Sequence, residues 1–123
     1  MTTYDFKDGK GPVPAHKHTN GGGWVAESAK VDNTAFVGPN AQVFGNALVS
    51  GNAQVFGNAQ VFGNARVYDN ARIYGYAQVF GNALVSGNAQ VFGNVRVFGN
   101  VRVFGKAHVS GNAIVSGDYQ QSS

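Results

Sequence analysis

The sequence predicts an all-β, single-stranded left-handed parallel β-helix (solenoid) of about five triangular coils with a short N-terminal cap. Three observations lead to this prediction. A six-residue repeat runs without interruption through most of the chain, and Gly or Asn ends most of the repeats. The composition is also unusual, because charged residues make up only 12% while Gly reaches 18 of 123 residues. The fifteen aromatic residues (Trp 1, Tyr 5, Phe 9) argue against disorder.

The repeat reads Ala-x-Val-x-Gly-Asn and begins at Ala29. A β-branched apolar residue, Val in every case but Ile73, recurs every six residues from position 31 to position 115. Ala stands two residues before it, replaced only by Val95 and Val101. Residues two apart in an extended segment point to the same side. Ala and Val are therefore predicted to fill the interior, while the residue between them points outward.

Each repeat ends in a corner such as Phe44-Gly45-Asn46. Gly and Asn tolerate left-handed backbone conformations, so a sharp turn is expected there. Three short strands joined by three corners close a triangle, which makes a coil of eighteen residues. Successive coils would then stack through parallel hydrogen bonds at about 4.8 Å.

Three segments are expected along the chain: an N-terminal cap over 1–24, the repeat region over 25–118, and a polar C-terminal tail over 119–123. The open end of a solenoid is a bare sheet edge and needs a cover. Trp24 and the prolines Pro12 and Pro14 indicate that the first segment is such a cover. The C-terminal end is short and polar, and it is predicted to be a poor cap.

Outward residues eighteen apart are predicted to form columns. The first aromatic column is Phe44, Phe62, Phe80 and Phe98, the second is Phe56, Tyr74 and Phe92, and a mixed column is Ser50, Tyr68, Ser86 and Phe104. Asn46, Asn64, Asn82 and Asn100 are expected to stack as an amide ladder. The rings either stack on one another or pack against other subunits. The first aromatic column is therefore the candidate interface.

Composition excludes several classes of function. A net charge of +3 gives no indication of nucleic acid as a partner, and the absence of Cys excludes disulfides and thiol chemistry. The first residues form no apolar run, so no secretory signal is expected. No stretch approaches about 20 apolar residues, so no membrane partner is expected either.

The repeats resemble those of the hexapeptide-repeat, left-handed β-helix family from about Val25 to Asp118. The usual repeat of that family, with Gly after the large apolar residue, occurs here only at Val37-Gly38-Pro39-Asn40-Ala41. The variant with Phe, Tyr or Ser in that slot resembles repeats of uncharacterised bacterial and prophage proteins, as does the lead-in from His16 to Val25. The resemblance implies a homotrimer. It also raises two enzymatic alternatives, since some members are acyltransferases with a His base and others are carbonic anhydrases with three His ligands on a metal.

The sequence offers little support for either enzyme. His16 and His18 lie about five coils from His108, so the three cannot meet within one subunit, and no loop interrupts the repeats. We therefore expect no catalytic residue, no bound metal and no cofactor, with His16 and His18 hydrogen-bonded inside the cap. Cationic residues gather in the last two coils, and in a trimer they could bind a small anionic ligand such as a nucleotide. These candidate ligand-binding residues are Arg96, Arg102, Lys106 and His108.

The leading hypothesis is a non-enzymatic, rigid structural or interaction module: a phage- or prophage-type homotrimeric scaffold that binds a protein partner. The first alternative is a phage-encoded binder of a small anionic, nucleotide-type ligand or an inhibitor of host defence. The second is a degenerate acyltransferase relative. The expected location is the cytoplasm of a bacterial host or the virion.

Overall fold

The computed structural model describes residues 2–117 and 120–122. In that part of the chain all regular structure is β, as predicted, and no helix has the length and hydropathy of a membrane span. The strands are short, mostly two residues each. Their bounds are β1 Thr3–Asp5, β2 Pro12–Lys17, β3 Trp24–Ala26, β4 Lys30–Val31, β5 Phe36–Val37, β6 Gln42–Val43, β7 Leu48–Val49, β8 Gln54–Val55, β9 Gln60–Val61, β10 Arg66–Val67, β11 Arg72–Ile73, β12 Gln78–Val79, β13 Leu84–Val85, β14 Gln90–Val91, β15 Arg96–Val97, β16 Arg102–Phe104, β17 His108–Val109, β18 Ile114–Val115 and β19 Gln120–Ser122.

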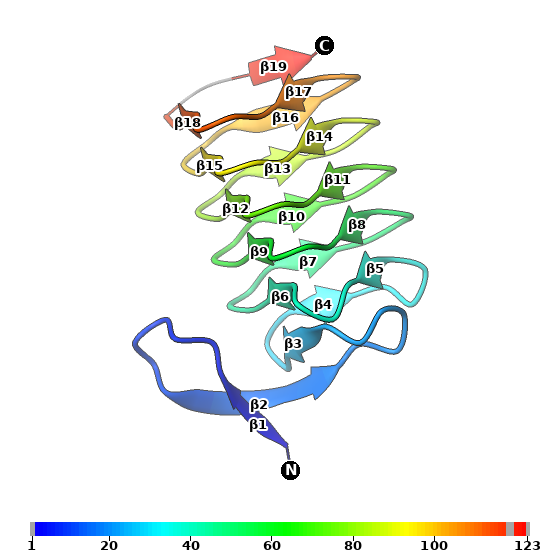
Figure 1. Cartoon of the computed structure of the whole chain (residues 1–123), viewed down its shortest axis with the longest axis vertical. Coiled ribbons are helices and arrows are strands. Elements are labelled where there is room, and N and C mark those ends of the chain that lie inside the picture. The colour runs from blue at the N-terminus through cyan, green and yellow to red at the C-terminus, as the bar shows by residue number, and fades with distance from the viewer. Residues whose placement is uncertain (1, 118–119, 123) are drawn as a thin grey trace.

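The strands form the three walls of a triangular prism (Figure 1). Wall B contains β1-β2-β3-β6-β9-β12-β15-β18, wall C contains β19-β16-β13-β10-β7-β4, and wall D contains β17-β14-β11-β8-β5. Within the coils every strand pairs in parallel with the strand eighteen residues later, as in Arg66↔Leu84. The far strands β7, β10 and β13 point right in Figure 1, and the chain returns leftward across the front as it climbs, which is a left-handed winding. The prediction of a parallel solenoid of about five coils is confirmed.

The interior of the prism is a single column of Ala and Val side chains. From Ala35 to Ala107 each interior Ala, Val or Ile of the repeats is at most 1% exposed, and together they form one continuous hydrophobic cluster. Burial of this many small apolar side chains is the main source of stability in a chain without disulfides. The Ala-x-Val pattern thus placed both residues correctly.

From Gly45 onward, each described corner is turned by a residue with positive φ. Gly63 has φ +67°, and a Cβ added there would lie 2.9 Å from the backbone N of Gly81 in the next coil. A side chain at Gly63 would therefore force the stacked corner to shift. Asp69 occupies the same place in its repeat with φ 59°, and its Oδ2 accepts a hydrogen bond from the Gly87 N–H at 3.1 Å.

The N-terminal segment covers the lower end of two walls. β1 pairs antiparallel with β2, and β2 pairs antiparallel with β3, which closes the edge of wall B. Under wall D the loop 18–23 takes the place of a strand, since the Gly23 N–H donates to the Val37 carbonyl and the Val37 N–H donates to the Asn20 carbonyl. A Cβ at Gly21 would lie 2.2 Å from the Val37 oxygen, so this close approach explains a glycine there.

The C-terminal residues differ from the expected tail. Instead of leaving the prism, β19 pairs in parallel with β16 and continues wall C for one more strand. Residues 118, 119 and 123 lie outside the described part of the chain. The chain thus keeps the eighteen-residue register to its last described strand.

Candidate functional site

The first aromatic column is a continuous stack of rings along one corner of the prism. Successive rings lie 4.7–4.8 Å apart and within 11° of parallel. The stack also has an extra ring at its lower end, because Phe6 of the cap lies 4.7 Å from Phe44. Phe44 is only 4% exposed as a result. Self-stacking therefore accounts for the geometry of this column, while Phe62, Phe80 and Phe98 remain half-buried at the surface.

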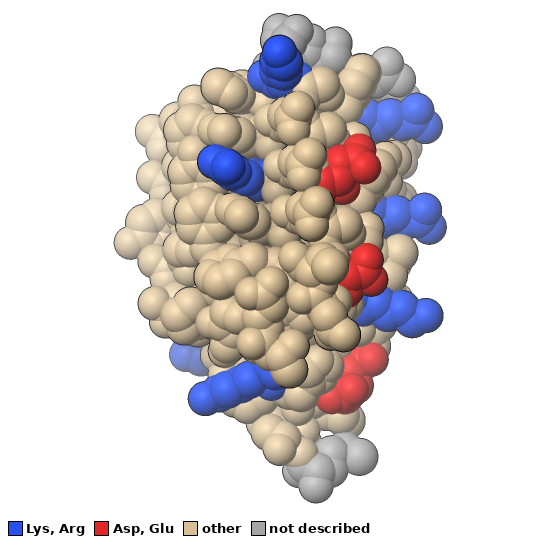
Figure 2. Space-filling view, turned by 90° about the vertical axis from the view of Figure 1, so that its right-hand side faces the viewer, with Lys and Arg blue, Asp and Glu red and all other residues tan. Residues whose placement is uncertain are grey.

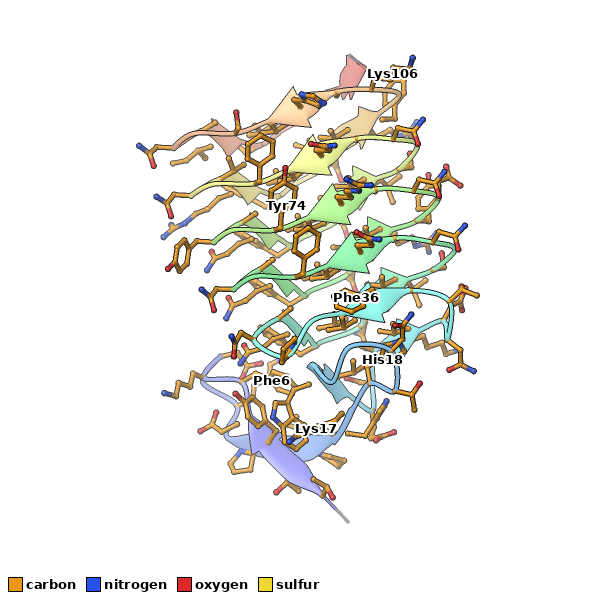
Figure 3. The ribbon with its side chains drawn as sticks, turned by 45° about the vertical axis from the view of Figure 1, so that its right-hand side comes forward. Phe6, Lys17, His18, Phe36, Tyr74 and Lys106 are labelled. Atoms are coloured by element: carbon orange, nitrogen blue, oxygen red, sulfur yellow. The ribbon has the colours of Figure 1, made fainter. Side chains whose placement is uncertain are left out.

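The second aromatic column has the same geometry. Phe56, Tyr74 and Phe92 stack at 4.8 and 4.9 Å with nearly parallel planes. Figure 3 shows Tyr74 in the middle of this stack, between the rings of the coils below and above. Its hydroxyl donates to Oε1 of Gln90 at 3.2 Å.

A ladder of side-chain amides runs up wall B. It starts at the Tyr4 hydroxyl in the cap, to which Gln42 Nε2 donates at 2.9 Å. Gln60 then donates to Gln42 at 3.0 Å, and Gln78 donates to Gln60 at 3.2 Å. An amide ladder was expected among the corner asparagines, but Asn46, Asn64 and Asn82 connect their coils through backbone bonds to Gly63, Gly81 and Gly99. The Asn94–Asn112 pair does form a side-chain bond, at 3.2 Å.

The mixed column leaves a gap between two rings. Tyr68 and Phe104 lie two coils apart, and Ser86 stands between them in the stack. Because serine carries no ring, the surface is hollowed there by about 290 Å³, lined by Tyr68, Leu84, Ser86, Arg102 and Phe104. We call this hollow the Ser86 notch.

The outward side chains of wall C alternate between a basic residue and leucine, so the pattern repeats every two coils. Lys30, Arg66 and Arg102 project from the first, third and fifth coils, with Leu48 and Leu84 in the coils between. Figure 2 shows Lys and Arg side chains in a vertical row along one edge, beside a row of acidic side chains. Leu48 and Leu84 occupy equivalent places because residues 41–58 and 77–94 are identical in sequence.

The four candidate ligand-binding residues do not converge within one chain. Arg96 lies on wall B, Arg102 on wall C and His108 on wall D, since each is six residues, and so one wall, from the next. Lys106 lies at a corner near the top of the prism (Figure 3). A site built from all four residues would need more than one subunit, and it stays a prediction.

The cap histidines make hydrogen bonds within the chain. His18 is 4% exposed, and its Nε2 lies 2.9 Å from the Ala35 carbonyl, which holds the loop 18–23 under the first coil (Figure 3). His16 Nδ1 lies 2.6 Å from Oε2 of Glu27. Hydrogen bonds inside the cap were expected, whereas both partners, Glu27 and Ala35, belong to the repeat region. Within residues 2–117 and 120–122, no three His, Asp or Glu side chains are grouped as a metal site.

Sequence reasoning missed three surface features. Phe6 and Tyr4 lie outside the repeats, so no spacing rule relates them to Phe44 or Gln42. The Gln ladder had a visible signal, three glutamines at positions 42, 60 and 78 of one outward row. The Ser86 notch had one too, the alternation of small and aromatic residues in the mixed column.

One family model matches this chain. The YdcK Beta solenoid repeat matches at residues 41–57, 59–75, 77–93, 89–105 and 95–111. Comparison with curated proteins and with solved structures returns no match. Membership of the hexapeptide-repeat family, implied by resemblance, stays a prediction. Because the matched residues cover more than half of the chain and coincide with the stacked coils, the protein belongs to the YdcK beta-solenoid repeat family.

Proposed function

We propose that the protein is a non-enzymatic, rigid module that displays outward side chains at fixed spacing to a protein partner. One observation carries the proposal: the coils from β4 to β18 are uninterrupted, so their outer surface consists of regular columns. Every buried side-chain nitrogen or oxygen of the described residues has a hydrogen-bond partner. A prism whose polar groups are satisfied internally suits a scaffold.

The position of His108 supports a non-enzymatic role. His108 lies on β17, an outward position of wall D, where it pairs in register with Gln90 of the coil below. An acyltransferase needs a base beside a bound substrate. An acyl-transfer assay in which His108→Ala removes a measurable activity would refute the non-enzymatic proposal.

The assembly we propose is a homotrimer that packs through the upper part of the first aromatic column, with a phage- or prophage-type origin as the resemblance implies. Phe62, Phe80 and Phe98 are half-buried, whereas Phe44 is covered by Phe6. Three protomers around a shared axis would bury these ring edges together. Aromatic side chains are enriched at such interfaces.

Analytical ultracentrifugation at micromolar concentration tests the assembly. The molar mass measured for the wild type should be three times the 12.9 kDa of one chain. Phe80→Ala should give folded monomers, while Tyr74→Ala, which removes a middle ring from the second column, should leave the trimer intact. A monomeric wild type, or equal dissociation by both variants, would show that the first column is not the interface.

A further inference from the structure

We propose that the Ser86 notch binds a planar aromatic ring that carries an anionic group, as in a nucleoside monophosphate. The site is separate from the first aromatic column, so this proposal goes beyond the scaffold function. It rests on the spacing of two rings, the small residue between them and the charge beside them.

The spacing suits one inserted ring. In the two complete columns, neighbouring rings lie 4.7–4.9 Å apart. The backbones of Tyr68, Ser86 and Phe104 follow the same eighteen-residue register. Rings two coils apart are therefore separated by about 9.6 Å, twice the strand spacing. A planar ring placed midway would stack on both, at the centroid distance that aromatic pairs prefer.

The walls of the notch are available to a ligand. Phe104 is 37% exposed, one of three large apolar side chains with substantial exposure among the residues whose side chains are described. Tyr68 and Ser86 are half-buried, and Leu84 gives the notch an apolar side. The volume of about 290 Å³ lies near the lower end of the range for small-ligand pockets.

Charge selects the kind of ring. Arg102 lines the notch, and Arg66 projects from the same wall two coils below it, with Leu84 between them. The ion pair found within the described residues is His16–Glu27, so no described carboxylate forms a salt bridge with Arg102 or Arg66. The Asp69 carboxylate, which follows Tyr68, accepts a hydrogen bond from the Gly87 N–H. An anionic substituent at the edge of the inserted ring can therefore accept hydrogen bonds from a guanidinium. The geometry thus points to an aromatic anion rather than a neutral ring.

The chain supplies a matched control. Ser50 occupies in the second coil the place that Ser86 has in the fourth, and residues 41–58 and 77–94 have the same sequence. Below Ser50, however, the stack continues to Asp32 of the first coil, so an aromatic ring bounds that position on one side only. Ser86→Phe fills the notch with a ring, whereas Ser50→Phe makes the same chemical change outside it.

Calorimetric titration with adenosine monophosphate, adenosine and indole-3-acetate tests the proposal on the full chain. The wild type should bind both anions, adenosine monophosphate and indole-3-acetate, and should bind adenosine more weakly. The relative affinity of the two anions shows whether the notch prefers a phosphate or a carboxylate. Ser86→Phe should stay folded and lose binding at least tenfold, while Ser50→Phe should bind as the wild type does. Removing one stacking face with Tyr68→Ala should weaken binding about tenfold.

Arg102→Gln should weaken binding of adenosine monophosphate about fivefold and leave adenosine unchanged, and Arg72→Gln on wall D should change neither. Thermal unfolding checks that each variant is folded. The proposal is overturned if no probe binds at millimolar concentration, if Ser86→Phe binds like the wild type, or if Ser50→Phe loses binding equally. Sedimentation of Ser86→Phe shows whether the assembly survives, so a failure here is separable from a failure of the scaffold proposal.

Discussion

Gly63 tests how strongly the corners constrain the fold. Alanine there would have to adopt φ +67° and place its Cβ 2.9 Å from the Gly81 nitrogen. A left-handed conformation costs an L-residue about 1–2 kcal/mol, and overpacking against fixed atoms adds about 1–3 kcal/mol. The Gly81 nitrogen is a backbone atom of the stacked coil, so it cannot rotate away from the added Cβ as a flexible side chain could. We therefore expect Gly63→Ala to lower the free energy of unfolding by about 3 kcal/mol.

Gly111 separates the two contributions. It has φ +81°, but nothing lies within 4 Å of a Cβ added there. Gly111→Ala should therefore cost only the conformational term, about 1–2 kcal/mol. Urea unfolding followed by circular dichroism measures both variants. If Gly63→Ala proves no more destabilising than Gly111→Ala, the close approach of stacked corners is not what requires glycine.

Three further substitutions probe the cap, the ladder and the core. Phe6→Ala removes a buried ring from Phe44, so it should cost about 3 kcal/mol and raise hydrogen exchange in β3 more than in β10; uniform exchange would contradict a local cap. Gln60→Ala breaks two amide hydrogen bonds and should lower unfolding free energy by about 1–2 kcal/mol in urea titrations, and no change would dismiss the ladder. Ile73→Val should cost about 0.5–1.5 kcal/mol by the same measurement, and a stabilised protein would mean that the third coil is overpacked.

The coils could be predicted because a single repeat length determines which residues lie inside, which form corners and which stack. A residue at position 67 must lie under the residue at position 85, so interior, corners and columns follow from the same count of eighteen. The basic residues show that closeness in sequence does not predict closeness in space in this fold. Arg96 and Arg102 are close in sequence, yet six residues carry the chain to the next wall.

The contacts of the N-terminal segment could not be predicted from the sequence. Its residues belong to no repeat, so nothing in their spacing places Phe6 on Phe44 or Tyr4 beneath Gln42. These contacts depend on the register of the β1–β2 hairpin and on the course of the loop 18–23. Both are tertiary features, and several strand pairings have similar local propensity, so the residues alone do not select one of them. The glycines 21–23 did indicate unusual backbone, but not which strand they would approach.

The identity of residues 41–58 and 77–94 has a consequence at the level of the gene. Two identical segments in phase with the coils allow recombination to delete or duplicate the residues between them without breaking the frame of hexads. Loss of residues 41–76 would join equivalent corners and leave a shorter prism with intact pairing. It would also remove Tyr68, whose place beneath Ser86 would fall to Asp32. A prism shortened or lengthened by such a step would keep its pairing, whereas the notch would be lost or gained with it.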